Sequence, residues 1–481
     1  MKLIKNKFFL NIIKVALSNV TTILAGVVAG FLLPKIIGVT NYGYYKTFSL
    51  YISYVSIFQF GIMEGIYLKF GGIDYDQLDK KLFRFYSQFL VLLEFFTSIF
   101  FVIISLLVFN NDYQFIFVCV SLFLLFQNIT TYYQYISQIT GRFNELSIRN
   151  VLKSILTIIS VIGMWIYYHY HSNNFLSYKI YTILYCAIFA LLMGWYMLTY
   201  KDILLGEKVK KEDIKENETI FSLLKIGLPL LISNLCSTMV FAIDRQFVSI
   251  LFDIDTYGSY SFAYNMLQLV TVATSSISTV LYPSLKNSNM KKLVQEYDNI
   301  VSIFNIFVLG CCLIYFPLKA FIPYFFASQS KYIDSLPIFR IILPSLVISC
   351  TITVIIHNYY KVFKLNIKYF FIVVIVLILS IITNFIAYYA FKTPESISVA
   401  SVITTFIWYL IANVYMHIKL KTKFLLEMIY MIIMILLFYC FSFLDSWWIG
   451  MIGYAISFVI TTLMFNFKNI KLFMQRFKKN K

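Results

Sequence analysis

Long apolar segments separated by short polar loops run along the whole chain. With clusters of Lys, Arg, Asn, Asp, Gly and Pro taken as loops, we count fourteen segments, each near the roughly 20 residues that a helix needs to cross a bilayer. They lack the alternation of barrel strands, and lipid offers no partner for an unpaired backbone group, so each is predicted to be a transmembrane α-helix. The predicted segments are residues 9–33, 46–69, 85–109, 115–138, 151–170, 179–200, 223–251, 257–281, 299–318, 338–360, 369–390, 397–418, 425–444 and 447–467.

The composition also indicates an all-α polytopic membrane protein. Of the 481 residues, 60% are apolar or aromatic and 13% are charged, whereas soluble chains carry about 25% charged residues. This balance excludes a soluble enzyme. The net charge of +18 lies in short loops between apolar segments, which is a pattern of membrane topology, so no nucleic-acid partner is expected.

The basic residues predict the orientation of the chain. With the N-terminus inside, 32 of the 40 lysines and arginines fall on the inner side, seven fall outside, and Arg245 lies within a segment. Because cytoplasmic loops are enriched in these residues, both termini are predicted to be cytoplasmic. The first segment starts like a secretory signal, but Asn11, Lys14 and Asn19 interrupt it and no small-residue cleavage site follows, so we expect an uncleaved helix.

A polar stretch and an internal repeat divide the chain. Residues 201–222 form the longest inner connection and are rich in Lys and Glu, as expected of a linker. The motif Asn-Tyr-Gly-Tyr-Tyr at 41–45 is matched by Thr-Tyr-Gly-Ser-Tyr at 256–260, which predicts two halves of the same orientation. The predicted parts are an N-terminal lobe (1–200, six spans), a cytoplasmic linker (201–222), a C-terminal lobe (223–420, six spans), and two extra helices with a basic tail (421–481).

Motifs for catalysis are absent from the sequence. It contains neither a Gly-x-x-x-x-Gly-Lys-Ser/Thr phosphate loop nor a His-Glu-x-x-His pair. All seven cysteines fall inside predicted segments, without metal-ligand spacing. We therefore expect no cofactor and no metal, and transport is favoured over enzymatic catalysis.

Ionisable residues within the segments are the strongest functional signals, because a charge at bilayer depth costs about 2.5–3.5 kcal/mol. Arg245 is predicted to grip phosphate oxygens in a wet cavity, with Asp244 orienting it or carrying a coupling cation. The alternative is a structural ion pair or an arginine that reaches the headgroups. Glu64 is either a coupling carboxylate or a polar residue at the inner surface, and Lys14 either reaches that surface or contacts a lipid headgroup.

Small residues and prolines mark contacts and bends. The spacing Gly-x-x-x-Gly occurs in the first and second segments and allows close helix packing. Two prolines remove backbone donors and are predicted to kink the seventh and tenth segments, where they either act as hinges or hold static bends. The predicted packing and hinge residues are Gly26, Gly30, Gly61, Gly65, Pro229 and Pro344.

Several motifs resemble oligosaccharide flippases of the Wzx type, a family grouped with lipid II flippases and multidrug exporters of the MATE type. The motifs are Leu-Pro-Lys-Ile-Ile-Gly at 33–38, Asn-Tyr-Gly at 41–43, Phe-Gly-Ile-Met-Glu-Gly at 60–65, Asp-Arg-Gln-Phe-Val at 244–248, Tyr-Gly-Ser-Tyr-Ser-Phe-Ala-Tyr at 257–264 and Leu-Tyr-Pro at 281–283. The resemblance implies two six-helix lobes around a cavity, with two helices beside it. It also implies transfer of a polyprenyl-pyrophosphate-linked oligosaccharide from the inner to the outer leaflet of a bacterial plasma membrane.

On this hypothesis, Arg245 neutralises the phosphates with help from Lys14 or Lys46, and Asp244 or Glu64 couples transport to a cation gradient. The expected partners are the lipid-linked oligosaccharide, membrane lipids, and the polymerase and chain-length machinery of polysaccharide assembly. Two alternatives remain: a cation-coupled multidrug exporter of the MATE type, and a membrane polysaccharide polymerase or sugar transferase.

Overall fold

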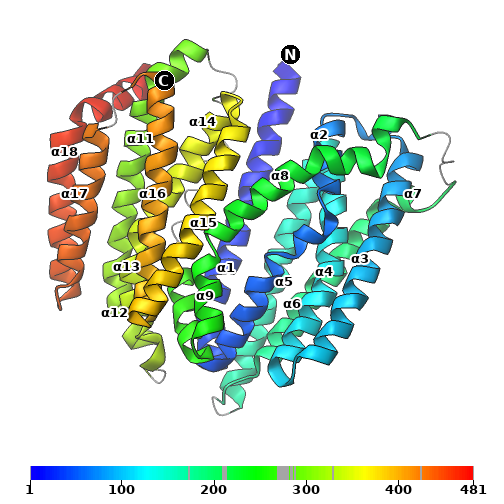
Figure 1. Cartoon of the computed structure of the whole chain (residues 1–481), viewed down its shortest axis with the longest axis horizontal. Helices are drawn as coiled ribbons and strands as arrows, with labels where there is room; N and C mark the ends of the chain where they lie inside the picture. Colours follow the sequence, from blue (N-terminus) through cyan, green and yellow to red (C-terminus); the bar gives the residue numbers. More distant parts are fainter. Residues whose placement is uncertain are drawn as a thin grey trace. The chain divides into compact units, whose positions relative to one another are not determined.

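We describe the protein from a computed structural model of the chain (Figure 1). The structure describes residues 2–171, 174–207, 214–267, 281, 285, 289–327, 330–422 and 425–479. Within these ranges, the side chains of residues 2–17, 19, 217, 292, 330 and 472–479 lie outside the description.

All regular secondary structure in the described ranges is helical. In the first half the helices are α1 (Lys2–Ile52), η1 (Val55–Gln59), α2 (Ile62–Phe70), η2 (Tyr75–Gln77), α3 (Lys80–Val108), α4 (Asn111–Ile139), α5 (Phe143–Tyr170), α6 (Tyr178–Thr199), α7 (Lys201–Leu204), η4 (Glu216–Glu218), α8 (Ile220–Val240) and α9 (Ile243–Leu251). In the second half they are α11 (Met290–Cys311), η5 (Cys312–Ile314), α12 (Tyr315–Phe325), η6 (Ser330–Tyr332), α13 (Ser335–Cys350), η7 (Thr351–Ile356), α14 (His357–Val362), α15 (Asn366–Phe391), α16 (Pro394–Leu420), α17 (Leu425–Ser442) and α18 (Trp447–Lys479).

Twelve helices in the described residues are long and apolar enough to cross a membrane, and the chain is a multi-pass membrane protein. Two of the fourteen predicted segments account for the difference in number. The segment at 9–33 lies in α1, whereas the segment at 46–69, which was predicted to be one helix, is divided among the end of α1, η1 and α2. Helix α1 is continuous except at Gly38, where φ is 76° and ψ is 168°. Glycine accepts this backbone conformation without a steric penalty. The segment at 257–281 lies partly outside the described residues. The count of fourteen and the cytoplasmic termini stay predictions.

The chain forms two compact units, Met1–Ala242 and Ile243–Lys481. The first unit includes α8, which the predicted division at 223 assigned to the C-terminal lobe. The reason is a close contact between α8 and α2. A Cβ atom on Gly227 of α8 would lie 1.9 Å from the carbonyl oxygen of Gly61 and 2.5 Å from the backbone nitrogen of Gly65. Only glycines let the two backbones approach this closely.

The core of the first unit, where α2, α3, α4, α6 and α8 meet, combines aliphatic side chains with several buried tyrosines. Tyr133 and Tyr200 stack with ring centroids 5.7 Å apart and are fully buried. The hydroxyl of Tyr132 donates to the carbonyl of Phe83 at 2.7 Å, and that of Tyr86 donates to the carbonyl of Glu218 at 2.6 Å. These tyrosines therefore bury large apolar rings while each polar end finds a partner.

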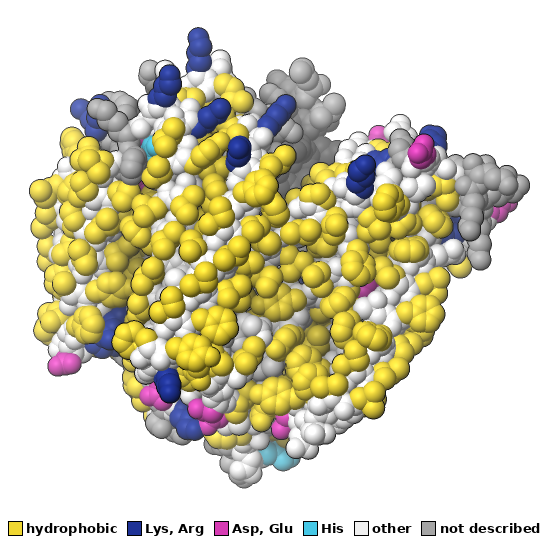
Figure 2. Space-filling view, in the orientation of Figure 1, with side chains coloured by type: hydrophobic (Ala, Val, Ile, Leu, Met, Phe, Trp, Pro, Cys, Tyr) yellow, Lys and Arg dark blue, Asp and Glu magenta, His cyan; other side chains and the backbone are white. Residues whose placement is uncertain are grey.

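Hydrophobic side chains cover the lengths of the helices, and charged side chains gather at their ends (Figure 2). Many large apolar residues are exposed, for example Leu107 at 79% and Phe96 at 65% on α3. A surface of this kind in a soluble protein would promote association, whereas in a bilayer it faces lipid. Apolar side chains along the outer surface of the helices and charged side chains at their ends are the pattern expected of a protein in a bilayer.

The first residues of the predicted linker are fixed to α3. The buried guanidinium of Arg84 donates to the backbone carbonyls of Asp202, Leu205 and Glu207. Nearby, Lys80 lies 2.7 Å from Asp202 in an ion pair, and the ion pair of Lys81 with Glu207 lowers the pKa of that carboxyl. The segment after α6 is thus anchored at its start.

Replacing Arg84 with methionine is expected to release this anchor. A hydrogen bond to a charged group contributes about 1.5–3 kcal/mol, and the substitution leaves three carbonyls without their donor. We expect faster tryptic cleavage between Lys201 and Lys225 in the purified protein. Lys81→Met removes only an exposed ion pair and serves as the control, because such pairs contribute little. Equal cleavage in both variants would contradict the anchoring role of Arg84.

Candidate functional site

The predicted seventh segment is interrupted just before Asp244 and Arg245. Helix α8 ends at Val240, Phe241 and Ala242 form a turn, and α9 begins at Ile243. The sequence predicted one continuous helix over 223–251, so this break is a correction. Its physical basis is that Asp244 lies in the first turn of α9, where a carboxylate interacts favourably with the helix dipole.

The carboxylate of Asp244 is 2% exposed and is held by three donors. Its Oδ1 accepts from the backbone N–H of Arg245 at 2.7 Å. Its Oδ2 accepts from the hydroxyls of Tyr260, at 2.9 Å, and Tyr264. These donors compensate for the loss of hydration, which would otherwise make a buried carboxylate costly.

The side chain of Arg245 is half-buried beside this cluster. Its guanidinium carbon lies 4.9 Å from the centroid of the Tyr264 ring, in cation–π geometry. The hydrogen bonds to Asp244 come from the two tyrosines and the backbone, so the carboxylate orients α9 and Tyr264, against which the guanidinium lies. This arrangement positions a permanent positive charge at a helix break, where it can bind an anionic group bidentately.

Helix α9 packs against α15 and α16, which carry further polar groups. The hydroxyls of Thr383 on α15 and Thr404 on α16 lie 2.9 Å apart. The side-chain oxygen of Asn384 is buried and has no hydrogen-bond partner in the described part of the chain.

Sequence reasoning missed these groups, together with Tyr260 and Tyr264. The motif at 257–264 contains both tyrosines, but it does not indicate which carboxylate they contact. The polar residues of α15 and α16 gave no comparable signal, because serine, threonine and asparagine are scattered through many segments.

The other predicted site residues belong to the first unit. The Nζ atom of Lys46 lies 5.2 Å from the centroid of Tyr42 and 5.9 Å from that of Tyr45. Glu64 is 5% exposed and accepts a hydrogen bond of 2.6 Å from Gln59. The side chain of Lys14 lies outside the described residues.

The predicted packing residues have different surroundings. Gly61 and Gly65 lie against α8, and a Cβ on Gly65 would be 2.3 Å from the carbonyl oxygen of Leu223. A Cβ on Gly26 would meet no described atom within 4 Å. Gly30 lies within α1, Pro229 within α8 and Pro344 within α13, and both prolines are in the interior of helices that continue past them. Their hinge role stays a prediction.

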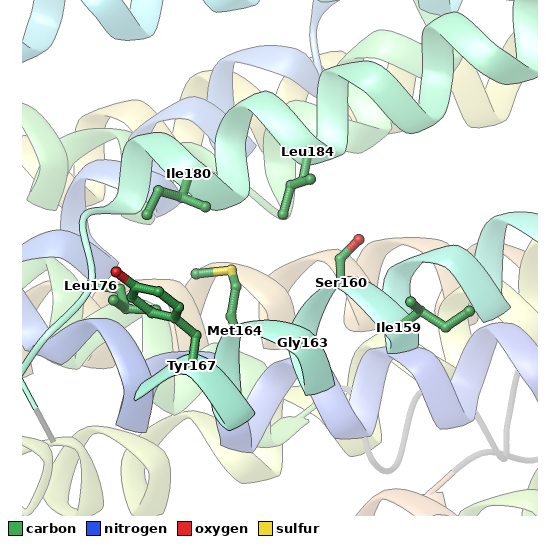
Figure 3. A pocket seen from close by; sticks show the side chains of 8 residues that line it. All are labelled: Ile159, Ser160, Gly163, Met164, Tyr167, Leu176, Ile180 and Leu184. Atoms are coloured by element: carbon green, nitrogen blue, oxygen red, sulfur yellow. The ribbon is translucent and has the colours of Figure 1, made fainter. Parts of the chain in front are cut away.

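A hollow of about 440 Å³ lies between α5 and α6 (Figure 3). Its lining is apolar apart from Ser160 and Tyr167, and includes Met164, Ile180 and Leu184. A lining without charged side chains does not compensate a pyrophosphate. The cluster at Asp244 and Arg245 is therefore the better candidate for an anionic headgroup.

Comparison with solved structures defines the class of fold. The chain is similar to the lipid II flippase MurJ in an inward closed conformation, with a TM-score of 0.68 and 17% identity over 96% of this chain and 100% of that one. It is also similar to a MOP superfamily transporter from Pyrococcus furiosus (TM-score 0.58, 12% identity, 85% and 95% covered). An outward-facing MATE multidrug transporter gives a TM-score of 0.56 with 11% identity over 85% and 95% of the chains. The protein has the fold of MOP superfamily transporters.

The family follows from the sequence itself. Residues 9–289, more than half of the chain, match the family described as polysaccharide biosynthesis protein. The chain belongs to this family. No curated protein is similar enough to the chain to count as a match.

Proposed function

We propose that this protein is a flippase, not an enzyme, that moves a polyprenyl-pyrophosphate-linked oligosaccharide from the inner to the outer leaflet of a bacterial plasma membrane. The family and the fold support transport in polysaccharide biosynthesis. The observation that carries the substrate class is Arg245, a permanent cation fixed beside Tyr264 and the buried Asp244 at a helix break.

The chemistry of the substrate requires such a site. A pyrophosphate and a chain of sugars cannot enter hydrocarbon unaided, because each unpaired polar group costs several kcal/mol there. Arg245 supplies the charge that replaces hydration of the phosphates, and Lys46 and Lys14 are further candidate cations. Alternating access then exposes this charge first to one leaflet and then to the other.

Transport by the purified protein in liposomes tests the proposal. The probe is a fluorescent polyprenyl-pyrophosphate oligosaccharide, and its arrival outside is detected by an enzyme that acts only on the outer leaflet. We expect protein-dependent arrival of the probe. If the probe stays inside while a cationic dye exchanges against sodium or protons, the proposal is wrong and the protein is a drug exporter.

The drug exporter is the second candidate because the fold is shared with MATE transporters and Asp244 is a buried carboxylate. Asp244→Asn separates its two predicted roles. The amide keeps the shape and one acceptor but carries no charge. If Asp244 couples transport to a cation, the variant loses its response to an imposed gradient and keeps downhill movement of the probe. Loss of both would instead assign Asp244 to positioning Arg245. Glu64→Gln is the parallel test of the other predicted carboxylate.

A further inference from the structure

A second buried polar cluster lies in the unit Ile243–Lys481, on helices other than α9. It is centred on Glu427, in the first turn of α17, whose side chain is 8% exposed. One carboxylate oxygen, Oε1, accepts from the amide of Asn305 on α11 and from the hydroxyl of Tyr409 on α16, each at 2.6 Å. The other, Oε2, is buried and has no hydrogen-bond partner in the described ranges.

A chain of hydrogen bonds fixes the orientation of the groups around Glu427. Thr351 donates to the side-chain oxygen of Asn305, so Asn305 turns its N–H toward the carboxylate. On the other side, Tyr297 donates to the oxygen of Asn413 at 2.7 Å, and the amide of Asn413 donates to the Tyr409 oxygen at 2.9 Å. Thr351 is the first residue of the π-helical segment η7, and π-helical turns are often found at functional sites.

Among the described residues, none of the groups that act on Glu427 carries a positive charge that would balance its ionised form. In the part of the chain that the structure describes, the titratable groups that face it are Tyr297 and Asp298 on α11 and Tyr409 on α16, with His417 two turns further along α16. Thr351 of η7 donates a hydrogen bond within this cluster, and the hydroxyl of Thr462 on α18 pairs with that of Tyr430 on α17. Neither threonine titrates. An ionised carboxylate buried without a countercharge carries a penalty of several kcal/mol. Binding a proton neutralises the carboxylate and so removes this penalty.

The same geometry favours a proton over a metal cation. A hard cation needs several oxygen lone pairs directed at it, but the neighbours of Glu427 present an N–H and an O–H. These two donors hold the side chain in place through Oε1 in both charge states. Oε2 is thus the atom at which a proton is gained or lost.

A polar face of α16 leads from Glu427 to the end of the helix. Tyr409, Asn413 and His417 follow one another at intervals of four residues and so lie on one face. The Nδ1 atom of His417 is 2.6 Å from the hydroxyl of Thr422 and 3.5 Å from the carboxylate of Asp298. The Asp298 side chain is 40% exposed. The polar face therefore ends at water, at the end of α16 that is predicted to be cytoplasmic.

We propose that Glu427 is a proton-binding site that couples transport to a proton gradient. In the arrangement described here, Oε2 holds the proton. The proton passes to water when α17 shifts against α11 and α16, and a proton from the opposite side restores the neutral acid. The inference rests on the proposed transport function, and it gives α17, which lies beside α18 at the C-terminal end of the chain (Figure 1), a part in energy coupling.

The first test measures proton binding without transport. Infrared absorption distinguishes a protonated carboxyl group from a carboxylate, so it is followed against pH in the purified wild-type protein, in Glu427→Gln and in Glu94→Gln. Glu94 is a fully buried carboxyl of α3 in the other unit and is the matched control. We expect one titrating carboxyl signal to disappear in Glu427→Gln and to remain in Glu94→Gln. Identical titrations in the wild type and Glu427→Gln would overturn the proposal.

The second test uses the liposomes and the fluorescent oligosaccharide probe. An imposed proton gradient is expected to accelerate wild-type transport at least severalfold, to leave the rate of Glu427→Gln unchanged, and to act normally on Glu94→Gln. A response of Glu427→Gln equal to that of the wild type, or a wild type driven by sodium alone, would overturn the coupling role. If no probe moves in any sample, the flippase function fails, while the infrared result still decides whether Glu427 binds a proton.

Tyr409→Phe provides a second variant that keeps the carboxyl group. It removes one of the two donors to Oε1, so the ionised form loses a stabilising hydrogen bond. A hydrogen bond to a charged group contributes about 1.5–3 kcal/mol. The midpoint of the Glu427 infrared signal is therefore expected to move to higher pH by about one unit or more. An unchanged midpoint would contradict the contact on which the inference depends.

Discussion

Replacing Arg245 with alanine is expected to reduce transport of the pyrophosphate-linked probe at least tenfold while the protein stays folded. Each hydrogen bond from a guanidinium to a phosphate oxygen contributes about 1.5–3 kcal/mol, and 1.4 kcal/mol is a factor of ten. Alanine also removes the cation from the Tyr264 ring but leaves the three donors to Asp244 intact. The measurement is the initial rate of probe arrival in liposomes.

Arg340→Ala is the matched control for this prediction. Arg340 belongs to the same unit, is half-buried, and places its guanidinium carbon 3.9 Å from the centroid of the Phe443 ring. It therefore resembles Arg245 in its contact but not in its position at a helix break. We expect near wild-type transport. If Arg245→Ala transports at the wild-type rate, or if both variants lose transport to the same degree, Arg245 does not have the proposed role.

Replacing Gly227 with alanine is expected to destabilise the unit Met1–Ala242. The new Cβ atom would lie 1.9 Å from the Gly61 carbonyl oxygen, far inside van der Waals contact, so α2 and α8 must separate. Overpacking of this kind costs about 1–3 kcal/mol or more when backbone atoms have to move. The measurement is the midpoint of thermal unfolding of the purified protein in detergent, which should fall.

Gly194→Ala in α6 provides the comparison, because its Cβ meets no described atom within 4 Å. In a helix, alanine is favoured over glycine by up to about 1 kcal/mol, so the midpoint should stay or rise. A Gly227→Ala variant as stable as Gly194→Ala would show that the α2–α8 contact is not needed for the stability of the unit.

The position of Asp244 and Arg245 illustrates what the sequence could predict. Both were visible as rare charges within apolar surroundings, since bilayer depth makes every charge expensive. Their partners were not visible. Tyr260 and Tyr264 lie 16 and 20 residues away from Asp244, and which of 38 tyrosines face a given carboxylate depends on how helices pack.

Glu427 was overlooked for a related reason. It stands two residues inside the predicted segment 425–444, where an acidic side chain is expected to reach the membrane surface. Hydrogen bonds from Asn305 and Tyr409 hold its carboxylate in the protein interior instead. Gly227 gave no signal either, because Gly61 and Gly65, which it contacts in the structure, formed a spacing motif only with each other in the sequence.

The sequence by itself determined the all-helical membrane class. Hydropathy and segment length are local properties, and they decide whether a segment can cross a bilayer as a helix. It also pointed to Asp244, Arg245 and Glu64, since a charged residue within an apolar segment can be recognised from the sequence alone. The tertiary structure alone decided where α8 ends and α9 begins, that α8 packs on α2, and which carboxylates are held by donors. These features depend on contacts between residues far apart in the chain, and hydropathy contains no information about such contacts.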